Sequence, residues 1–231
     1  MNDREYRKTI DYIYELIANG MMKTGDRLPT ERTFSEKLGI SRNSVREALK
    51  TLENLGLIES RQGSGNYLTN NVSAAIAKAV DIMLLMNCIT SAEIGQFRRH
   101  MDKSVCNYLI TYGCKEKYFE QMREAIGRMT TASERYLRTD ADRDFHFILI
   151  HATENQLWIT LFDAVYEVYR RLIDDAQLNA DEETIAYLMS LHRGIYDALK
   201  KKDMAACYEM LDKHYDTTER LLSELEAARR G

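Results

Sequence analysis

Apolar residues recur at helical spacing in three short segments near the start of the chain, and two brief extended segments follow them. This pattern predicts helices over residues 6–18, 30–39 and 41–56, and short strands over residues 57–60 and 66–69. A glycine-rich loop separates the two strands, as in a β-hairpin. Two helices joined by a tight turn and followed by a hairpin form a winged helix-turn-helix, which is the fold expected for this part of the chain.

The helical spacing also divides these segments into an apolar face and a polar face. The residues expected to point inward are Ile10, Ile13, Ile17, Val45, Leu49, Leu52 and Leu55. Arg32, Arg42 and Arg46 fall on the opposite face, and the hydroxyl groups of Ser41 and Ser44 stand at the start of the third helix. Short polar and cationic side chains at a helix N-terminus suit the base edges and phosphates of a DNA major groove. The pattern therefore predicts a DNA-binding head; a small domain that binds another protein is the alternative.

The rest of the chain shows helical periodicity without strand-like alternation, and the whole sequence contains a single proline. Helices are expected at about residues 73–87, 91–111, 115–132, 139–153, 157–177, 181–201 and 203–228. Asn70 and Asn71 form a polar linker, so the sequence predicts two domains, residues 1–70 and residues 71–231. The expected fold class is mostly α, with a winged helix-turn-helix followed by an all-α helical bundle.

The distribution of charge narrows how the head would hold DNA. The chain has a formal net charge of −4, but residues 1–70 contain 11 Lys and Arg against 10 Asp and Glu. The head is therefore expected to act through a few arginines rather than through a broad basic surface. No apolar run is long enough to cross a membrane, and the N-terminal residues lack an apolar signal core. A cytoplasmic location is expected.

A second group of chemically active residues lies in the helical part. Asp142 and His146 are four residues apart and therefore project from one face of a helix. His192 and His214 each fall on the apolar face of a later helix, whereas His151 points away from His146. A single inward histidine is usually a hydrogen-bonded core residue, but three of them with a carboxylate indicate a bound divalent metal. The donor types suit Zn²⁺, Ni²⁺, Mn²⁺ or Fe²⁺, and the spacing does not distinguish these ions.

The head resembles the winged helix-turn-helix domain of the GntR family of bacterial transcription regulators. The matching positions are Gly25, Arg27-Leu28-Pro29-Thr30-Glu31-Arg32, Ser41-Arg42, Val45-Arg46-Glu47-Ala48-Leu49, Leu52, Gly56-Leu57-Ile58 and Gly63-Ser64-Gly65. The residues that the resemblance assigns to DNA binding are Arg32, Ser41, Arg42, Asn43, Ser44, Arg46, Gln62 and Gly63. Asn43 and Ser44 stand at positions that vary with the operator, and Gln62 and Gly63 belong to the wing near the minor groove. The family binds short inverted repeats as dimers, so the expected partners are double-stranded operator DNA and a second copy of the chain.

Residues from about 73 to 225 resemble the FCD domain, the all-helical effector domain of the FadR subfamily of GntR regulators. The order Asp142-x-x-Phe145-His146, Asn155, His192 and His214 matches the metal-binding version of that domain. The resemblance implies one divalent metal ion per chain, with zinc the first expectation. The implied ligands are Asp142, His146, His192 and His214.

Arg98 belongs to another element of this resemblance. With Met101 and Asp102 it resembles the Arg-x-x-Leu-Glu element of the FCD domain, although an aspartate replaces the usual glutamate. The resemblance implies a bundle with a central cavity in which the metal and Arg98 receive a small carboxylate, such as a hydroxy acid or a sugar acid. Asn155 is the second residue expected to bind this effector.

The expected function is a DNA-binding transcriptional repressor whose operator affinity is controlled by a small carboxylate at the metal. In the first alternative the metal itself is the signal. A metalloenzyme domain fused to a DNA-binding head is the second alternative, because an open metal site can activate water. The sequence has no HExxH motif, nucleophile elbow or phosphate loop, so it is not expected to be an enzyme. The acyl-CoA-binding founder of the subfamily lacks the metal set, which argues against a fatty acyl-CoA effector.

Overall fold

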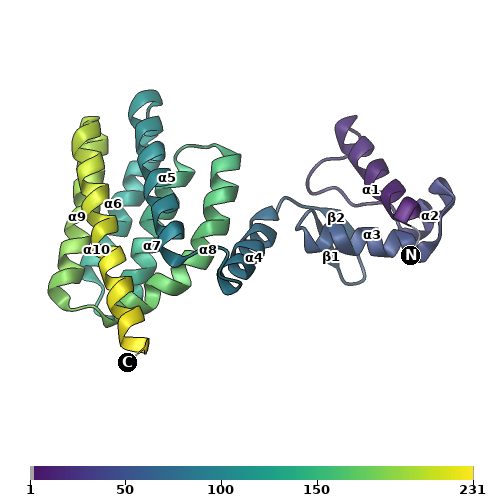
Figure 1. Ribbon diagram of the computed structural model, residues 1–231. Coiled ribbons are helices and arrows are strands. Elements are labelled where there is room, and N and C mark those ends of the chain that lie inside the picture. Colours follow the sequence, from purple (N-terminus) through teal and green to yellow (C-terminus); the bar gives the residue numbers. More distant parts are fainter. Residues whose placement is uncertain (1–2, 231) are drawn as a thin grey trace. The chain divides into compact units, whose positions relative to one another are not determined.

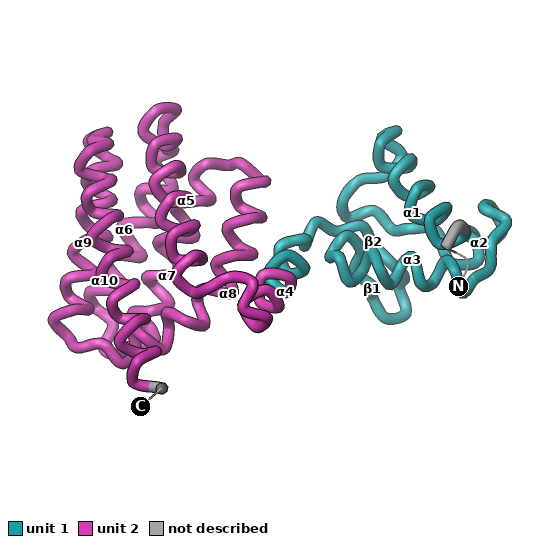
Figure 2. The backbone as a smooth tube through the Cα atoms, viewed as in Figure 1, with its two compact units in different colours: residues 1–78 teal, residues 79–231 magenta. Residues whose placement is uncertain are grey.

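The computed structural model describes residues 3–230, and within them the chain forms ten helices and one two-stranded hairpin (Figure 1). Backbone contacts divide it into two compact units, the first ending at Lys78 and the second beginning at Ala79 (Figure 2). The division falls within helix α4 (Val72–Leu85), just beyond the linker predicted at residues 70 and 71. The chain therefore passes from one unit to the other within a helix.

The first unit contains the predicted winged helix-turn-helix (Figure 1). Its elements are α1 (Asp3–Ala18), α2 (Glu31–Leu38), α3 (Arg42–Asn54), β1 (Ile58–Arg61) and β2 (Gly65–Leu68). The two strands pair antiparallel, with Ile58 opposite Leu68. Both strands begin and end within one residue of the predicted positions, so the prediction of this fold is confirmed.

Two hydroxyl side chains determine where the helices of the helix-turn-helix begin. Oγ1 of Thr30 accepts the backbone N–H of Thr33, and Oγ of Ser41 accepts the backbone N–H of Ser44. Gly39, with a φ of 63°, ends α2 in the left-handed conformation and allows the tight turn into α3. These caps satisfy N–H groups that a helix start leaves free, and they place the first turn of the reading helix, α3, as the sequence predicts.

One hydrophobic core joins the helices of the head to its hairpin. It consists of Ile13, Leu28, Phe34, Ile40, Val45, Leu49, Leu52, Ile58 and Leu68. Two of the predicted inward positions are wrong, because Ile17 and Leu55 are exposed. In α1 the buried pair is Ile13 and Leu16, so Ile17 lies at the edge of that apolar stripe. Leu55 is the C-cap residue of α3, beyond the last turn that faces the core.

Gly56 shows how closely the chain packs where the reading helix ends. Its φ is 69°, and an added Cβ would lie 2.0 Å from the backbone oxygen of Asn71. We expect Gly56→Ala to lower the free energy of unfolding by more than about 1 kcal/mol, because the backbone must move as well as accept a strained φ. Gly20→Ala is the matched control, since Gly20 has the same φ of 69° and no atom within 4 Å of its added Cβ. Urea unfolding of the two variants separates the clash from the strain, and equal losses would contradict the close contact.

The second unit is helical throughout its described residues (Figure 1). After α4 come α5 (Ser91–Tyr112), α6 (Glu116–Thr131), α7 (Arg135–His151), α8 (Gln156–Asn179), α9 (Glu182–Lys201) and α10 (Met204–Arg230). All seven predicted helices are present, and the largest difference is the start of α7, at Arg135 instead of residue 139. In the described part of the chain, no helix is both long enough and apolar enough to cross a bilayer.

The helices of the second unit enclose a core and a set of buried polar side chains. α10 packs along α9 and α5, α6 packs along α7, and α5 also contacts α8. The core includes Cys106, Met122, Phe145, Ile195 and Leu211. The buried polar residues among them include Arg98, Asp102, His146, His192 and His214. Burying such groups is costly unless they find partners, so their partners indicate what this unit binds.

Candidate DNA-reading surface and metal centre

The arginines predicted to contact DNA are exposed, as that role requires. The side chains of Arg32, Arg42 and Arg46 have 77%, 62% and 56% of their surface accessible. Asn43 is also exposed and lies with Arg42 in the first turn of α3. The reading helix therefore presents cationic and hydrogen-bonding groups at its N-terminal end, where a major-groove helix contacts bases.

Acidic side chains already partner these groups in the protein alone. Glu31, the first residue of α2, accepts hydrogen bonds from Nε and Nη2 of Arg46, at 3.1 and 2.9 Å. Nη2 of Arg42 lies 3.9 Å from the same carboxylate. The hydrogen bonds from Arg46 lower the pKa of Glu31. Glu5 in α1 accepts a hydrogen bond of 2.9 Å from Oγ of Ser44. No local pattern in the sequence marks these partners, because they lie on other helices.

The wing places its two predicted DNA-binding residues at the tip. Gln62 and Gly63 are exposed between β1 and β2, and the φ of Gly63 is 72°. An added Cβ at Gly63 would meet nothing within 4 Å, so glycine serves the turn conformation here rather than the packing. The guanidinium of Arg61 lies 4.4 Å from the ring centre of Tyr67, and its Nη2 atom donates to Oε2 of Glu59 at 3.0 Å beside this tip.

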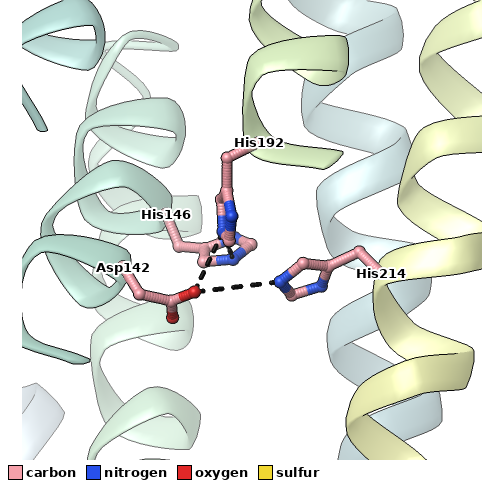
Figure 3. Close-up of side chains that lie close together, drawn as sticks. All are labelled: Asp142, His146, His192 and His214. Atoms are coloured by element: carbon pink, nitrogen blue, oxygen red, sulfur yellow. Dashed lines mark hydrogen bonds and ion pairs between the residues drawn. The ribbon is translucent and has the colours of Figure 1, made fainter. Parts of the chain in front are cut away.

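In the second unit the four predicted metal ligands converge (Figure 3). Asp142 and His146 come from α7, His192 from α9 and His214 from α10, and one ligand atom of each lies within 4.8 Å of the others. Nε2 of His192 is 3.0 Å from Oδ1 of Asp142 and 3.3 Å from Nε2 of His146. Nε2 of His214 is 3.9 Å from the same oxygen of Asp142. The three imidazoles are buried, and the carboxylate is partly accessible.

Hydrogen bonds around this cluster determine which ring nitrogens face it. Nδ1 of His192 lies 2.8 Å from the carbonyl oxygen of Leu188, which can only accept, so this nitrogen carries a proton. Nδ1 of His146 lies 2.9 Å from Oδ2 of Asp102, which accepts in the same way. With Nδ1 protonated, the neutral form of either ring turns the lone pair of Nε2 toward the cluster, where these two atoms are 3.3 Å apart. Such lone pairs repel each other unless a proton or a metal cation lies between them.

His214 adds a second indication of a cation. Neither of its ring nitrogens has a hydrogen-bond partner among the described residues, although the side chain is buried. Burial lowers the pKa of His214 to about 3, against the opposing effect of Asp142. Burial would raise the pKa of Asp142, but the surrounding imidazoles, His192 first, hold it well below its usual range. A neutral imidazole and an ionised carboxylate are the forms that bind a metal, so the residues present fit one.

Asp102 forms a hydrogen bond with His146, a predicted metal ligand, on the side of the ring that faces away from the cluster. Its Oδ2 atom accepts hydrogen bonds from His146, at 2.9 Å, and from the hydroxyl of Tyr215, at 2.6 Å. Burial would raise the pKa of Asp102, but the interaction with His146 lowers it. A carboxylate bound to the far nitrogen of a metal-binding histidine fixes the ring and increases its basicity. No local pattern marks this role, because Asp102 and His146 are 44 residues apart.

Arg98, which is predicted to bind the effector, is buried against aromatic rings. The carbon atom of its guanidinium lies 4.6 Å from the ring centre of Tyr166, 4.8 Å from that of Tyr169 and 5.3 Å from that of Phe162. These rings attract the cation, yet Nε and Nη2 have no hydrogen-bond partner among the described residues. Two adjacent guanidinium donors without partners match the geometry of a carboxylate.

Asn155 is the other residue predicted to bind the effector, and its surroundings differ from those of Arg98. It is exposed, and its side-chain oxygen accepts the backbone N–H groups of Leu157 and Trp158, at 3.1 and 3.2 Å. The structure thus gives Asn155 the role of N-cap of α8, and its contact with an effector stays a prediction. His151, expected to lie outside the metal cluster, stacks on Phe147 with ring centres 4.0 Å apart.

Comparison with known protein families identifies the class of this chain. Residues 5–68 match the bacterial regulatory proteins of the gntR family, and residues 83–217 match the FCD domain. The chain belongs to the GntR regulators with an FCD domain. These families consist of DNA-binding transcriptional regulators and not enzymes, and FCD domains bind small-molecule effectors and include metal-binding members.

This GntR regulator is similar to curated relatives along most of its length. It is 26% identical over 230 residues to the Uxu operon regulator of Haemophilus influenzae, covering 96% of this chain and 84% of the relative. It is 27% identical over 212 residues to the transcriptional regulator LutR of Bacillus subtilis, covering 90% and 96%. A solved GntR structure from Streptococcus agalactiae superimposes with a TM-score of 0.72 at 19% identity, covering 93% of this chain and 99% of that one, which shows a common fold.

Proposed function

We propose that this regulator is a homodimeric repressor whose affinity for an inverted-repeat operator is controlled by a small carboxylate bound at a divalent metal. The observation that carries the proposal is the cluster of Asp142 and three histidines, where four buried or partly buried ligand atoms converge and the ring nitrogens of His214 have no hydrogen-bond partner among the described residues. Zn²⁺ is the first choice for this donor set, and Ni²⁺, Mn²⁺ or Fe²⁺ are the others. When bound, such a metal supplies a positive charge and a coordination position for an oxygen of the effector.

The residues around Arg98 favour a carboxylate as the effector. The unpartnered Nε and Nη2 atoms form a fork for its two oxygens, and the aromatic rings exclude water from the charge pair. Asp102 is four residues from Arg98 on α5 and bonds the metal ligand His146. A hydroxy acid or a sugar acid adds a hydroxyl oxygen beside the carboxylate, which suits a site with a metal and an arginine.

Effector binding in the second unit can affect the DNA-binding head through the helices that connect them along the chain. α5 carries Arg98 and follows α4, the helix that contains the boundary between the two units in the sequence. α5 also packs against α10, which carries His214. A ligand that binds groups of α5 and the metal cluster favours one arrangement of these helices, and operator affinity shifts if the arrangements differ in DNA binding. The domains proposed are residues 1–70 for DNA and residues 71–231 for metal and effector, acting in the cytoplasm.

Operator binding after metal removal distinguishes this proposal from a metal sensor. The protein is stripped with a chelator, reloaded with Zn²⁺, and titrated with an operator duplex in the presence and absence of small hydroxy acids and sugar acids. We expect the stripped protein to bind the operator and to respond to an acid only when the metal is restored. Operator affinity that follows the metal concentration alone would support the sensor.

Arg98→Met tests whether the guanidinium of Arg98 binds the carboxylate of the effector, because methionine keeps the apolar stem and removes the guanidinium. A ligand at about 100 times its dissociation constant stabilises its protein by about 2.7 kcal/mol, and we expect this gain to vanish in Arg98→Met while the metal content stays that of the wild type. Asp181→Ala is the comparison variant, because Asp181 is the exposed N-cap of α9 and accepts the backbone N–H of Thr184 at 2.7 Å. It should lose about 1 kcal/mol of stability with its helix cap but keep the response to the acid. If Arg98→Met shows the full response to the acid in a thermal-shift assay, Arg98 does not bind the carboxylate.

A further inference from the structure

The carboxylate of Glu31 lies between the two arginines at the start of the reading helix. Arg46 donates to both of its oxygens, from Nε at 3.1 Å and from Nη2 at 2.9 Å, and Nη2 of Arg42 is 3.9 Å from Oε2. The Glu31 side chain is 27% exposed, whereas more than half of each arginine side chain is exposed. The acid is therefore sheltered, while the cations that it contacts face the solvent.

We propose that Glu31 determines the sequence specificity of the head. It holds Arg46 in the orientation that a base contact needs, and it offsets positive charge that would otherwise attract phosphates of any sequence. Glu31 is thus a positioning residue that acts through Arg46 and Arg42. The inference rests on the proposed contacts of these two arginines with the operator.

The hydrogen bonds leave the base-reading edge of Arg46 available. A guanidinium has one edge formed by Nε and one Nη atom and a second edge formed by both Nη atoms. Glu31 uses the first edge, so the second edge is left for the O6 and N7 acceptors of a guanine. Fixing a long side chain before DNA arrives also removes part of the entropy cost of ordering it on binding. Arg46 is then an oriented reader and not a flexible cation.

The negative charge of Glu31 weakens nonspecific binding to DNA. Each phosphate that a protein neutralises adds to its affinity and to the salt dependence of binding, whatever the bases. Because Glu31 is within ion-pair distance of both Arg42 and Arg46, this group of three side chains has one net positive charge instead of two. Attraction to phosphates is weakened, while a base contact that depends on hydrogen-bond geometry is kept. The near balance of acidic and basic residues in the head has the same effect.

Glu36 provides a matched comparison on the same helix. It accepts a single hydrogen bond, of 2.8 Å, from Nε of Arg32, and both side chains are largely exposed. Arg32 is four residues away in α2, so this pair does not reach the arginines of α3. Glu36→Gln therefore removes the same charge as Glu31→Gln without releasing a side chain of the reading helix.

The experiment uses the full-length protein at a fixed metal content. The probe is a duplex selected by the wild-type protein from a random-sequence pool, and the reference is the same duplex with its repeat scrambled. Fluorescence anisotropy gives both dissociation constants at several salt concentrations. For Glu31→Gln we expect tighter binding to the scrambled duplex, with a log–log salt dependence steeper by about one. The ratio of the two dissociation constants should fall by about fivefold or more, whereas Glu36→Gln should keep it within about twofold.

The possible outcomes test the role of Glu31 separately from the DNA contacts of Arg42 and Arg46, on which that role rests. In an Arg46→Ala background, Glu31→Gln should not lower the ratio further, because the carboxylate then has no guanidinium fork to orient. A normal ratio in Glu31→Gln together with an impaired Arg46→Ala overturns the role of Glu31 and leaves the DNA contacts in place. A normal ratio in Arg46→Ala refutes the DNA contact itself. A lower unfolding temperature of Glu31→Gln with a normal ratio shows a purely structural role and also overturns the inference.

Discussion

Arg46→Ala is expected to abolish the specific complex with an operator duplex, and Arg42→Ala to do the same. Both arginines are exposed at the start of α3, the end of a reading helix that approaches base edges. A lost base contact occurs twice in a complex with a dimer, so we expect operator affinity to fall by about thirtyfold or more. Arg46→Ala also leaves Glu31 without its hydrogen-bonded cation, which adds repulsion toward DNA.

Lys50→Ala is the control for these variants, because Lys50 is an exposed cation further along the same helix. It should weaken binding to operator and scrambled duplexes by a similar, small factor. The arginine variants should unfold at the wild-type temperature and retain the metal, since neither side chain belongs to the core of the head. Electrophoretic mobility shifts on both duplexes provide the measurement. If both arginine variants retain normal operator binding, the proposed reading surface is wrong.

His192→Ala is expected to remove the metal and the stability that depends on it. Its Nε2 atom lies 3.0 Å from Asp142 and 3.3 Å from Nε2 of His146, so it is central to the cluster. At about 1,000 times its dissociation constant a bound metal stabilises the folded state by about 4.1 kcal/mol. We expect the wild-type protein to lose a stabilisation of this order when a chelator removes the metal, and His192→Ala to show no difference between the two conditions.

Comparing each variant with and without metal separates metal loss from the cavity that the substitution leaves. The cavity lowers the stability of His192→Ala in both conditions, whereas the metal-dependent gain is a difference within one variant. His100→Ala is the control, because His100 is exposed and its Nδ1 atom lies 2.7 Å from the backbone oxygen of Gln96 in its own helix. It should retain one metal ion per chain. Metal analysis that finds equal metal in His192→Ala and the wild type would make the cluster a hydrogen-bonded polar core.

Local patterns in the sequence were sufficient to predict most of the head. Thr30 and Ser41 are cap residues followed by apolar positions at helical spacing, so the starts of α2 and α3 could be predicted from short segments alone. The errors at Ile17 and Leu55 occur where a residue lies at the edge of an apolar stripe or beyond a helix end. Periodicity predicts the direction in which the apolar face of a helix points. The number of residues that are buried on that face depends on the elements that pack against it.

The candidate metal site was predictable for a different reason. Asp142 and His146 share one helix face, and His192 and His214 interrupt apolar faces, so each residue could be selected within its own helix. Asp102 and Glu31 could not be selected in this way, because their partners lie on other helices and only the fold brings them together. The structure shows Asn155 as a helix cap, and the effector contact that the resemblance implies for it stays a prediction.

The close approach of Gly56 to Asn71 bears on how such heads can be exchanged between proteins. The backbone oxygen of Asn71 occupies the space that any side chain at Gly56 would need, so residues beyond the hairpin take part in the packing of the head. A chimera joined at residue 70 would replace one side of this contact with a residue from the new body. A junction placed within α4, beyond the contact, transfers both sides together. The winged helix is therefore a transferable module only when the first turn of α4 is transferred with it.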